Sequence, residues 1–203
     1  IILTPIFFPV AIILLLTGEN KIFYKQKRIG EGNKDFGIYK FVTMIENSPN
    51  IGSGIYTAKN DPRILPFGKI LRKTKINELP QIINILLGDM SFVGPRPLIK
   101  QTYLFYNKNE QKLISSVKPG LTGVGSIVFR DEGTLLSKSK INLENFYELN
   151  IAPNKAMLEI WYVNNKSFVV DFLTIVLTAW VILFPKSNLI YSVFKSLPKI
   201  DFK

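Results

Sequence analysis

The sequence predicts an α+β protein, mostly helical: a monotopic membrane protein with a re-entrant N-terminal helix, a small β-hairpin and interfacial amphipathic helices. Three observations indicate this class: an uncharged apolar segment at residues 1–16, partial alternation of polar and apolar residues at 35–44, and apolar residues at helical spacing beyond them. At 203 residues the chain is long enough for one domain with its own core. We expect a single domain over residues 1–203, with a membrane-inserted segment at 1–18, a cytoplasmic part at 19–170 and an apolar, interfacial tail at 171–203.

The first segment is apolar but short. Residues 1–16 carry no charge and are interrupted only at Thr4, Pro5 and Pro9. A helix of this length reaches about 24 Å, whereas a bilayer core is about 30 Å thick. Because the prolines lack a backbone N–H and favour a kink, a helix that enters one leaflet and turns back fits better than a span. The alternatives are a truncated transmembrane helix and a signal-peptide core, although a small-residue cleavage site is missing. Since the chain begins with Ile, we expect further residues upstream.

Basic residues directly after this segment indicate the side of the membrane that it faces. Lys21, Lys25, Lys27 and Arg28 lie within eight residues. Such a cluster beside an apolar segment is typical of the cytoplasmic side, and each charge near anionic headgroups contributes about 1 kcal/mol. We therefore expect contact with anionic membrane lipids.

The small hairpin is predicted around a Gly-Glu-Gly-Asn turn at residues 30–33. Residues 35–44 after this turn are rich in Phe, Ile, Tyr and Val, with partial alternation of polar and apolar side chains. Residues 46–59 are rich in Gly, Ser and Asn and are expected to form a mobile surface loop.

Composition limits the chemistry. The net charge is +11, so anionic partners are expected, and 47% apolar residues favour a membrane or a phosphorylated metabolite over nucleic acid, for which no motif is present. The chain has no Cys and no His, which excludes disulfides, thiolate nucleophiles and imidazole bases. Chemistry therefore depends on carboxylates, Arg, Lys, Tyr and a hard cation held by oxygen ligands.

A basic cluster leads into the candidate site. Residues 59–75 contain six basic side chains and one acid, and Lys69, Arg72 and Lys73 share a helical face. A solvated surface would explain this run as well as a phosphate site would. Because the run continues directly into Asn77 and Glu78, we favour a phosphate site.

The next helix is predicted to begin near Asn77, a good N-cap residue, with Glu78 favourable against the helix dipole, and to end at Gly88. The predicted helix has an apolar stripe of Ile76, Leu79, Ile82, Ile83 and Leu86 and a polar stripe of Asn77, Gln81 and Asn84. Capping alone would also explain Asn77 and Glu78. After the helix, Arg96 stands between two prolines, a stiff setting that suits bidentate binding of a phosphate or carboxylate.

The remaining segments are mostly helical in pattern. We expect an amphipathic helix at 98–117, a Gly-rich turn at 118–125 that either connects two elements or faces a phosphate, a charged triplet at 130–132, and helices at 145–150 and 153–162. The apolar run at 171–184 is too short for a span and is expected in a core or in the membrane interface.

Several motifs resemble those of the bacterial sugar transferases, which are monotopic phosphoglycosyl transferases. The resemblance covers nearly the whole chain in the family's order. It is carried by residues 23–30 (FYKQKRIG), 39–44 (YKFVTM), 60–63 (NDPR), 71–72 (LR), 78–81 (ELPQ), 88–97 (GDMSFVGPRP) and 118–123 (KPGLTG).

The resemblance implies transfer of a sugar phosphate from a UDP-sugar to undecaprenyl phosphate with Mg²⁺ as cofactor and UMP as by-product. This step starts exopolysaccharide, O-antigen or other surface-glycan synthesis at the cytoplasmic face of the bacterial inner membrane. The implied partners are the UDP-sugar, undecaprenyl phosphate and downstream glycosyltransferases. In this comparison Thr4 and Pro5 correspond to the Ser-Pro pair that breaks the family's re-entrant helix.

The sequence departs from the family at the centre of the site. The family carries an Asp-Glu pair whose Asp attacks the sugar-proximal phosphate to give a covalent phosphosugar intermediate, whereas this chain has Asn77 and Glu78. An amide caps a helix as well as a carboxylate does, but it is a poor nucleophile. The catalytic candidates are Glu78, Asn77 and Asp89, with Glu78 also the candidate metal ligand. The candidate phosphate-binding residues are Arg63, Arg72, Lys73 and Arg96.

Three interpretations of Asn77 follow. The chain is an active branch in which Glu78 or Asp89 attacks or binds the metal; it is a variant arrested before the covalent step; or it is a catalytically impaired membrane protein that binds nucleotide sugars or acts as a scaffold.

Overall fold

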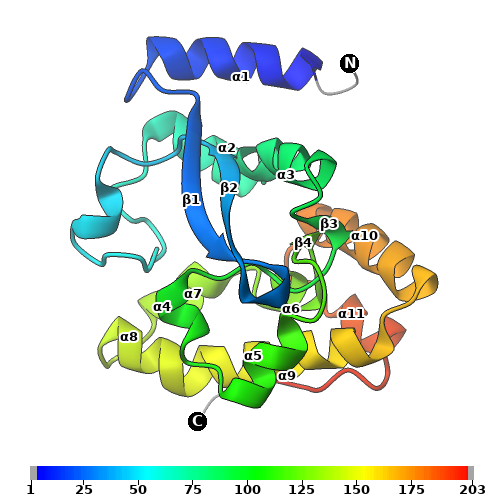
Figure 1. The fold of residues 1–203 in the computed structure, drawn as a ribbon. Helices are drawn as coiled ribbons and strands as arrows, with labels where there is room; N and C mark the ends of the chain where they lie inside the picture. The colour runs from blue at the N-terminus through cyan, green and yellow to red at the C-terminus, as the bar shows by residue number, and fades with distance from the viewer. Residues whose placement is uncertain (1–3, 201–203) are drawn as a thin grey trace.

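The computed structural model describes residues 4–200 and is an α+β fold in which helices predominate (Figure 1). The strands are β1 (Phe23–Ile29), β2 (Asp35–Phe41), β3 (Ser91–Val93) and β4 (Gly120–Thr122). The α-helices are α1 (Thr4–Leu16), α2 (Pro66–Lys73), α3 (Ile82–Leu86), α4 (Lys100–Tyr103), α5 (Lys108–Ile114), α6 (Val124–Val128), α7 (Glu132–Ser137), α8 (Leu143–Phe146), α9 (Ala152–Asn165), α10 (Phe168–Leu183) and α11 (Leu189–Val193). Two irregular helices matter for the site: the 3₁₀ segment η3 (Ile76–Gln81) runs into α3, and the π segment η4 (Tyr147–Ile151) joins α8 to α9.

The predicted hairpin is confirmed. Strands β1 and β2 pair antiparallel from Phe23 opposite Phe41 to Ile29 opposite Asp35. The turn between them places Gly32 and Asn33 at positive φ, a conformation that these two residue types accept at low cost. The hairpin runs from α1 toward the layer that contains α5 and α9, so it connects the two ends of the molecule (Figure 1).

Helix α1 lies across one end of the hairpin (Figure 1) and packs on it with one face only. Val10 and Leu14 are buried in a small cluster with Phe41 and Leu71. The opposite side remains apolar and exposed, with Phe8 at 66% and Leu16 at 78%. Such a surface is typical of an element that meets another apolar phase.

The predicted proline kink in the first segment is only partly tested. The helix α1 continues through Pro9 without interruption, so the expected kink at this residue is not present. Thr4 and Pro5 begin the helix, and the residues before them, on which a break at this pair depends, lie outside the described residues. Within residues 4–200 no helix has the length and apolar character needed to cross a bilayer.

The prediction that Asn77 caps a helix is wrong. The segment begins after Lys75 at a φ of 62° and forms η3, and no side chain caps it. The polar stripe faces inward: Asn84 is fully buried, donates to the carbonyl of Gly37 (2.8 Å) and accepts from the N–H of Tyr39 (3.0 Å). Since these bonds fix α3 to the hairpin, Leu86 on the opposite side is left 82% exposed.

The single helix predicted at 98–117 is also wrong, because the segment is divided into α4 and α5. Asn107 accepts from the N–H of Glu110 while the Glu110 carboxylate accepts from the N–H of Asn107. This reciprocal capping box starts a new helix and therefore ends the preceding turn.

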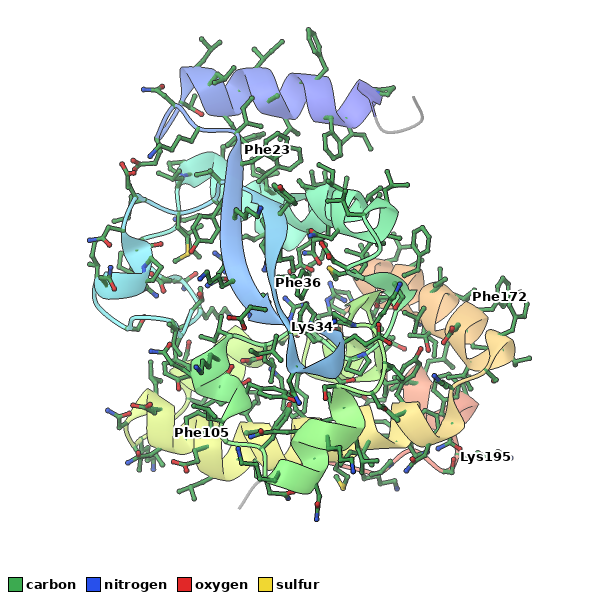
Figure 2. All side chains as sticks on the ribbon, viewed as in Figure 1. Phe23, Lys34, Phe36, Phe105, Phe172 and Lys195 are labelled. Atoms are coloured by element: carbon green, nitrogen blue, oxygen red, sulfur yellow. The ribbon has the colours of Figure 1, made fainter. Side chains whose placement is uncertain are left out.

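The C-terminal half contains most of the core. Helices α8 and α9 are continuous through η4, and Ile151, Ala152, Ala156 and Leu158 are fully buried there. The helical predictions at 145–150, 153–162 and 171–184 are confirmed, the last as α10. Helix α10 buries Leu177 and Val181 but keeps an exposed apolar side, from which Phe172 points outward (Figure 2).

Candidate active site

The hairpin, α2, η3, α6, α9 and α10 enclose a cavity of about 1210 Å³. Ten Lys or Arg side chains and four Glu side chains line it. Because low-dielectric walls strengthen the field of clustered charges, this excess of cations selects an anionic ligand.

Glu78 is the carboxylate at the centre of the cationic cluster. Its Oε1 accepts from Nη2 of Arg96 at 2.8 Å and lies 3.9 Å from Nζ of Lys40. Burial alone would raise the pKa of this carboxyl, but Arg96, Lys40 and Lys75 outweigh it and hold the pKa far below its ordinary value. Glu78 is therefore ionised at every physiological pH.

Arg96 is positioned by two short parallel strands. Strands β3 and β4 pair with Ser91 opposite Gly120, and the Gly120 N–H donates to the carbonyl of Pro95 at 2.9 Å. A Cβ on Gly94 would lie 2.4 Å from the carbonyl oxygen of Lys118, so only glycine allows this close approach. The paired strands thus hold the Gly94 to Arg96 backbone beside the Gly-rich turn and direct the guanidinium toward Glu78.

Four further cations surround this ion pair without an equal number of acids. Burial lowers the pKa of Arg28 to about 10, with the Arg96 charge as the second cause. Burial also lowers the pKa of Arg72 and Lys75 and lowers that of Lys40 strongly, while Glu78 opposes the shift in each. A lowered pKa of a basic group means that its positive charge is unfavourable in the cavity. A bound anion would offset this unfavourable free energy.

Several buried polar atoms of the cavity lining have no hydrogen-bond partner in the protein. They are Asn77 Oδ1, Ser126 Oγ, Tyr56 Oη, Arg28 Nε and Arg130 Nη1. Native proteins leave few such atoms without a partner, since each costs about 1–3 kcal/mol. Donors and acceptors without partners on residues that line the same cavity indicate a polar ligand with several oxygens.

The structure brings together four of the residues predicted from sequence. Asn77, Glu78, Arg72 and Arg96 all line the cavity. The carboxylate of Asp89 instead lies beside Asn84 Nδ2 at 3.4 Å and does not line the cavity. Lys73 is exposed on α2 and is not part of the lining.

Arg63 also lies apart from the cavity lining and is fully engaged elsewhere. It is 4% exposed and pairs with Asp61 through Nε (2.9 Å) and Nη2 (2.6 Å). Its other donors reach carbonyl groups of the 48–56 loop, among them those of Ser48 (2.7 Å) and Tyr56 (2.7 Å). Arg63 therefore organises the loop that forms one wall, and a donor directed at a substrate phosphate would have to leave these partners.

We expect Arg63→Ala to lower the free energy of unfolding by about 3–5 kcal/mol, because it leaves the buried carboxylate of Asp61 without its counter-charge. Urea unfolding measures this change. The control is Lys73→Ala, which removes an exposed cation and should stay within about 0.5 kcal/mol of the native protein. Equal stability of the two variants would contradict the structural role of Arg63.

Sequence reasoning did not assign several residues of the cavity to the site. Arg28 and Lys40 come from the two strands of the hairpin and Arg130 follows α6, and nothing in their spacing predicts that they meet. Lys75 belongs to the basic run at 59–75 that leads into the predicted phosphate site, and it lines the cavity. Lys155 was missed as well; it is 4% exposed on α9, pairs with Glu132 at 2.5 Å and lies over the ring of Tyr147. The charged triplet at 130–132 was the one local signal for this side of the cavity.

The oxygen atoms of Asn77 and Glu78 are the candidate protein ligands for the expected Mg²⁺. The described residues 4–200 hold no group of three acidic, His or Cys side chains that could bind a metal by themselves. Mg²⁺ is commonly held by one or two protein oxygens together with substrate phosphates and water. Asn77 Oδ1, which has no partner, and the adjacent Glu78 carboxylate fit this donor set if the substrate supplies the other ligands.

Comparison with known proteins identifies the relatives of this chain. The family model described as bacterial sugar transferase matches residues 1–185. The uncharacterized sugar transferase EpsL of Bacillus subtilis is 35% identical over 173 residues, which cover 85% of this chain and 75% of EpsL. The UDP-glucose:undecaprenyl-phosphate glucose-1-phosphate transferase of Xanthomonas campestris is 35% identical over 185 residues, covering 87% of this chain and 34% of that protein. A UDP-N-acetylgalactosamine-undecaprenyl-phosphate N-acetylgalactosaminephosphotransferase of Aeromonas hydrophila is 35% identical over 130 residues, 62% of this chain and 30% of its own length. The chain thus spans about a third of the latter two relatives.

Proposed function

This chain belongs to the bacterial sugar transferase family, and from that premise we propose that it transfers a sugar phosphate from a UDP-sugar to undecaprenyl phosphate. The reaction would start synthesis of an exopolysaccharide, O-antigen or other surface glycan at the cytoplasmic face of the bacterial inner membrane. The observation that carries the proposal is the ionised Glu78 carboxylate, paired with Arg96 inside a cavity lined mainly by cations.

The cations supply a site for the diphosphate of the nucleotide sugar. Arg96, Arg72 and Lys40 lie around Glu78, and Arg130 offers a buried donor without a partner. Arg binds phosphate oxygens in a bidentate manner, and preorganised cations stabilise the charge that develops during phosphoryl transfer.

Glu78 is the carboxylate best placed for the chemistry. In the proposed first step a Glu78 oxygen attacks the sugar-proximal phosphorus, the bond from that phosphorus to the bridging oxygen breaks, and UMP leaves with the electron pair. In the second step an oxygen of undecaprenyl phosphate attacks the same phosphorus, which releases the carboxylate and gives the polyprenyl diphosphate sugar. Glu78 and Asn77 would hold Mg²⁺, which would neutralise charge on the phosphate oxygens.

The acceptor needs an apolar path as well as a phosphate site. Ile175, Ala179 and Ile182 of α10 line the cavity, and the same helix carries Phe172 and Leu183 on its exposed surface. An isoprenoid chain could follow α10 from the cavity to a membrane. The exposed apolar sides of α1 and α3 support a membrane-associated protein in the same way.

We expect Ile175→Asn to raise the KM for the polyprenyl phosphate about tenfold with little change in the KM for the UDP-sugar, because it removes about 1–2 kcal/mol of apolar contact. Steady-state kinetics with each substrate varied in turn measures both constants. The matched control is Val176→Asn, one residue along α10 but outside the cavity lining. An equal rise in both variants would place the acceptor elsewhere.

The proposed reaction is tested by UMP release from a panel of UDP-sugars in the presence of undecaprenyl phosphate and Mg²⁺. Release that depends on both substrates is the expected result, and intact mass should increase by one phosphosugar when the acceptor is omitted. Failure of the whole protein to release UMP with every sugar would refute the transferase proposal.

One observation favours a second candidate function. An amide, Asn77, occupies the position at which the family carries its attacking Asp, and its Oδ1 is buried without a partner. The chain could then bind nucleotide sugars at the membrane without turnover and act as a scaffold for downstream glycosyltransferases. This candidate predicts that Glu78→Gln leaves glycan synthesis in cells unchanged at equal protein level, whereas the transferase proposal predicts its loss.

A further inference from the structure

Glu159 is a buried acid of α9 that the proposed chemistry does not use. It is 3% exposed, and its Oε1 accepts a hydrogen bond from the backbone N–H of Arg96 at 3.2 Å. Its second oxygen, Oε2, is buried and has no partner. Burying a carboxyl group with one oxygen unpaired costs folding free energy, so we infer that Glu159 has a functional role.

The segment predicted as a Gly-rich turn instead forms β4 and the start of α6, and the start of α6 is shaped around this carboxyl group. A Cβ on Gly125 would lie 2.4 Å from Glu159 Oε1, and one on Gly123 would lie 4.0 Å from Oε2. At Gly123 the tighter neighbour is the carbonyl oxygen of Gly94, at 2.2 Å. Residues 123–125 at the start of α6, the backbone at 94–96 and Glu159 therefore form one close-packed unit behind the cavity wall.

This unit contacts Glu78, the proposed reacting carboxylate, through Arg96. Glu159 holds the N–H of Arg96, and the guanidinium of the same Arg96 donates to Glu78 at 2.8 Å. A change in the backbone of Arg96 would move the guanidinium, because the two neighbouring prolines leave this segment little freedom to compensate.

We propose that Glu159 is a positioning residue: it fixes the Arg96 backbone against residues 123–125 at the start of α6 and thereby keeps the Arg96 guanidinium on Glu78 and on the substrate phosphate. The inference rests on the proposed function for its substrate, a nucleoside diphosphate sugar. It adds a role for a residue that lies outside the cavity lining.

The burial of Glu159 gives the unit a dependence on pH. Burial raises the pKa of Glu159 to about 7, against the opposing influence of the Arg96 N–H, Lys155 and the Arg96 charge. Tyr106 and Tyr162 are the other titratable groups that interact with it, and burial holds both of them protonated well above neutral pH. When Glu159 ionises, it adds negative charge behind a site that binds an anion, which should weaken nucleotide binding.

The test compares Glu159→Leu, Glu159→Gln and the control Glu148→Gln, which changes an exposed acid in η4. UDP is the probe, and its Kd is measured by calorimetry together with kcat and KM for the UDP-sugar. Leu removes the acceptor for the Arg96 N–H, so we expect UDP binding to weaken about tenfold and kcat to fall by more than KM rises. Gln keeps an acceptor oxygen and should restore both to within about threefold of the native protein.

The pH profile keeps the inference testable if Glu159→Leu fails to fold. Between pH 6 and pH 8, roughly one unit to either side of the Glu159 pKa, UDP affinity of the native protein should fall relative to that of Glu159→Gln. Parallel profiles, or a Leu variant that loses stability but binds UDP normally, would overturn the positioning role. Native protein that binds UDP with this dependence but releases no UMP would refute the proposed function alone, and absence of UDP binding would refute both.

Discussion

Glu78→Gln should lower kcat/KM for UMP release about a thousandfold or more, the scale expected when a group that acts directly on the reacting phosphate is lost. The amide keeps the size of the side chain but cannot attack phosphorus and is a weaker metal ligand than the carboxylate. Because surrounding cations hold the pKa of Glu78 far below its ordinary value, the native residue is ionised throughout the usable pH range. A profile of kcat/KM from pH 6 to 9 should therefore show no titration of Glu78.

A matched control separates this effect from a general loss of negative charge. Asp89→Asn makes the same chemical change, carboxylate to amide, eleven residues further along the chain, beside Asn84 and outside the cavity. It should leave kcat/KM within about twofold. Unfolding is followed in parallel, since Arg96 and Lys40 lose a counter-charge in Glu78→Gln. A folded Glu78→Gln protein with a rate within tenfold of native would mean that another group carries the reaction.

The parts of the fold that could be predicted depend on local patterns. The hairpin follows from strand residues beside a Gly-Glu-Gly-Asn turn, and α10 follows from the mainly apolar run at 171–184. Each signal lies within a few residues of the element that it forms. Neither needed knowledge of the packing partner.

The errors arise where distant contacts override the local pattern. Asn77 is a good capping residue, but tertiary packing draws its segment into a 3₁₀ turn with the amide buried. The stripe of Asn77, Gln81 and Asn84 faces the hairpin because Asn84 completes its hydrogen bonds there, and this leaves the apolar stripe partly outward. The apolar side chains left outward form an exposed apolar surface, which supports the proposed association with a membrane.

The candidate site shows the same division. Arg96 could be assigned to the site from sequence because the two neighbouring prolines restrict its backbone and no acid lies beside it. Arg63, in contrast, has Asp61 two residues away, and in the structure these two side chains form an ion pair. Lys40 and Glu159 reach the site from other elements, so only the fold could assign them.

Asn77→Asp is expected to raise the rate of UMP release about a hundredfold or more, because it adds a carboxylate where the present amide is a poor nucleophile. Asn77 lines the cavity next to Glu78, and its Oδ1 is buried without a partner, so an added negative charge would face an excess of cations and remain ionised. The present chain would then work slowly through Glu78, and the variant would have the Asp-Glu pair of its family. Single-turnover kinetics together with intact mass after incubation with the UDP-sugar measures the change.

The site of the covalent phosphosugar decides between the interpretations of Asn77. Peptide mapping should find it on Glu78 in the native chain and on the new carboxylate in Asn77→Asp; no adduct in the native chain but a strong one in the variant would identify a natural arrest before the covalent step. The control is Asn109→Asp, the same change at an exposed position of α5, which should alter neither rate nor adduct. If Asn77→Asp is no faster than this control, residue 77 does not reach the phosphorus, and Glu78 alone must account for any transfer.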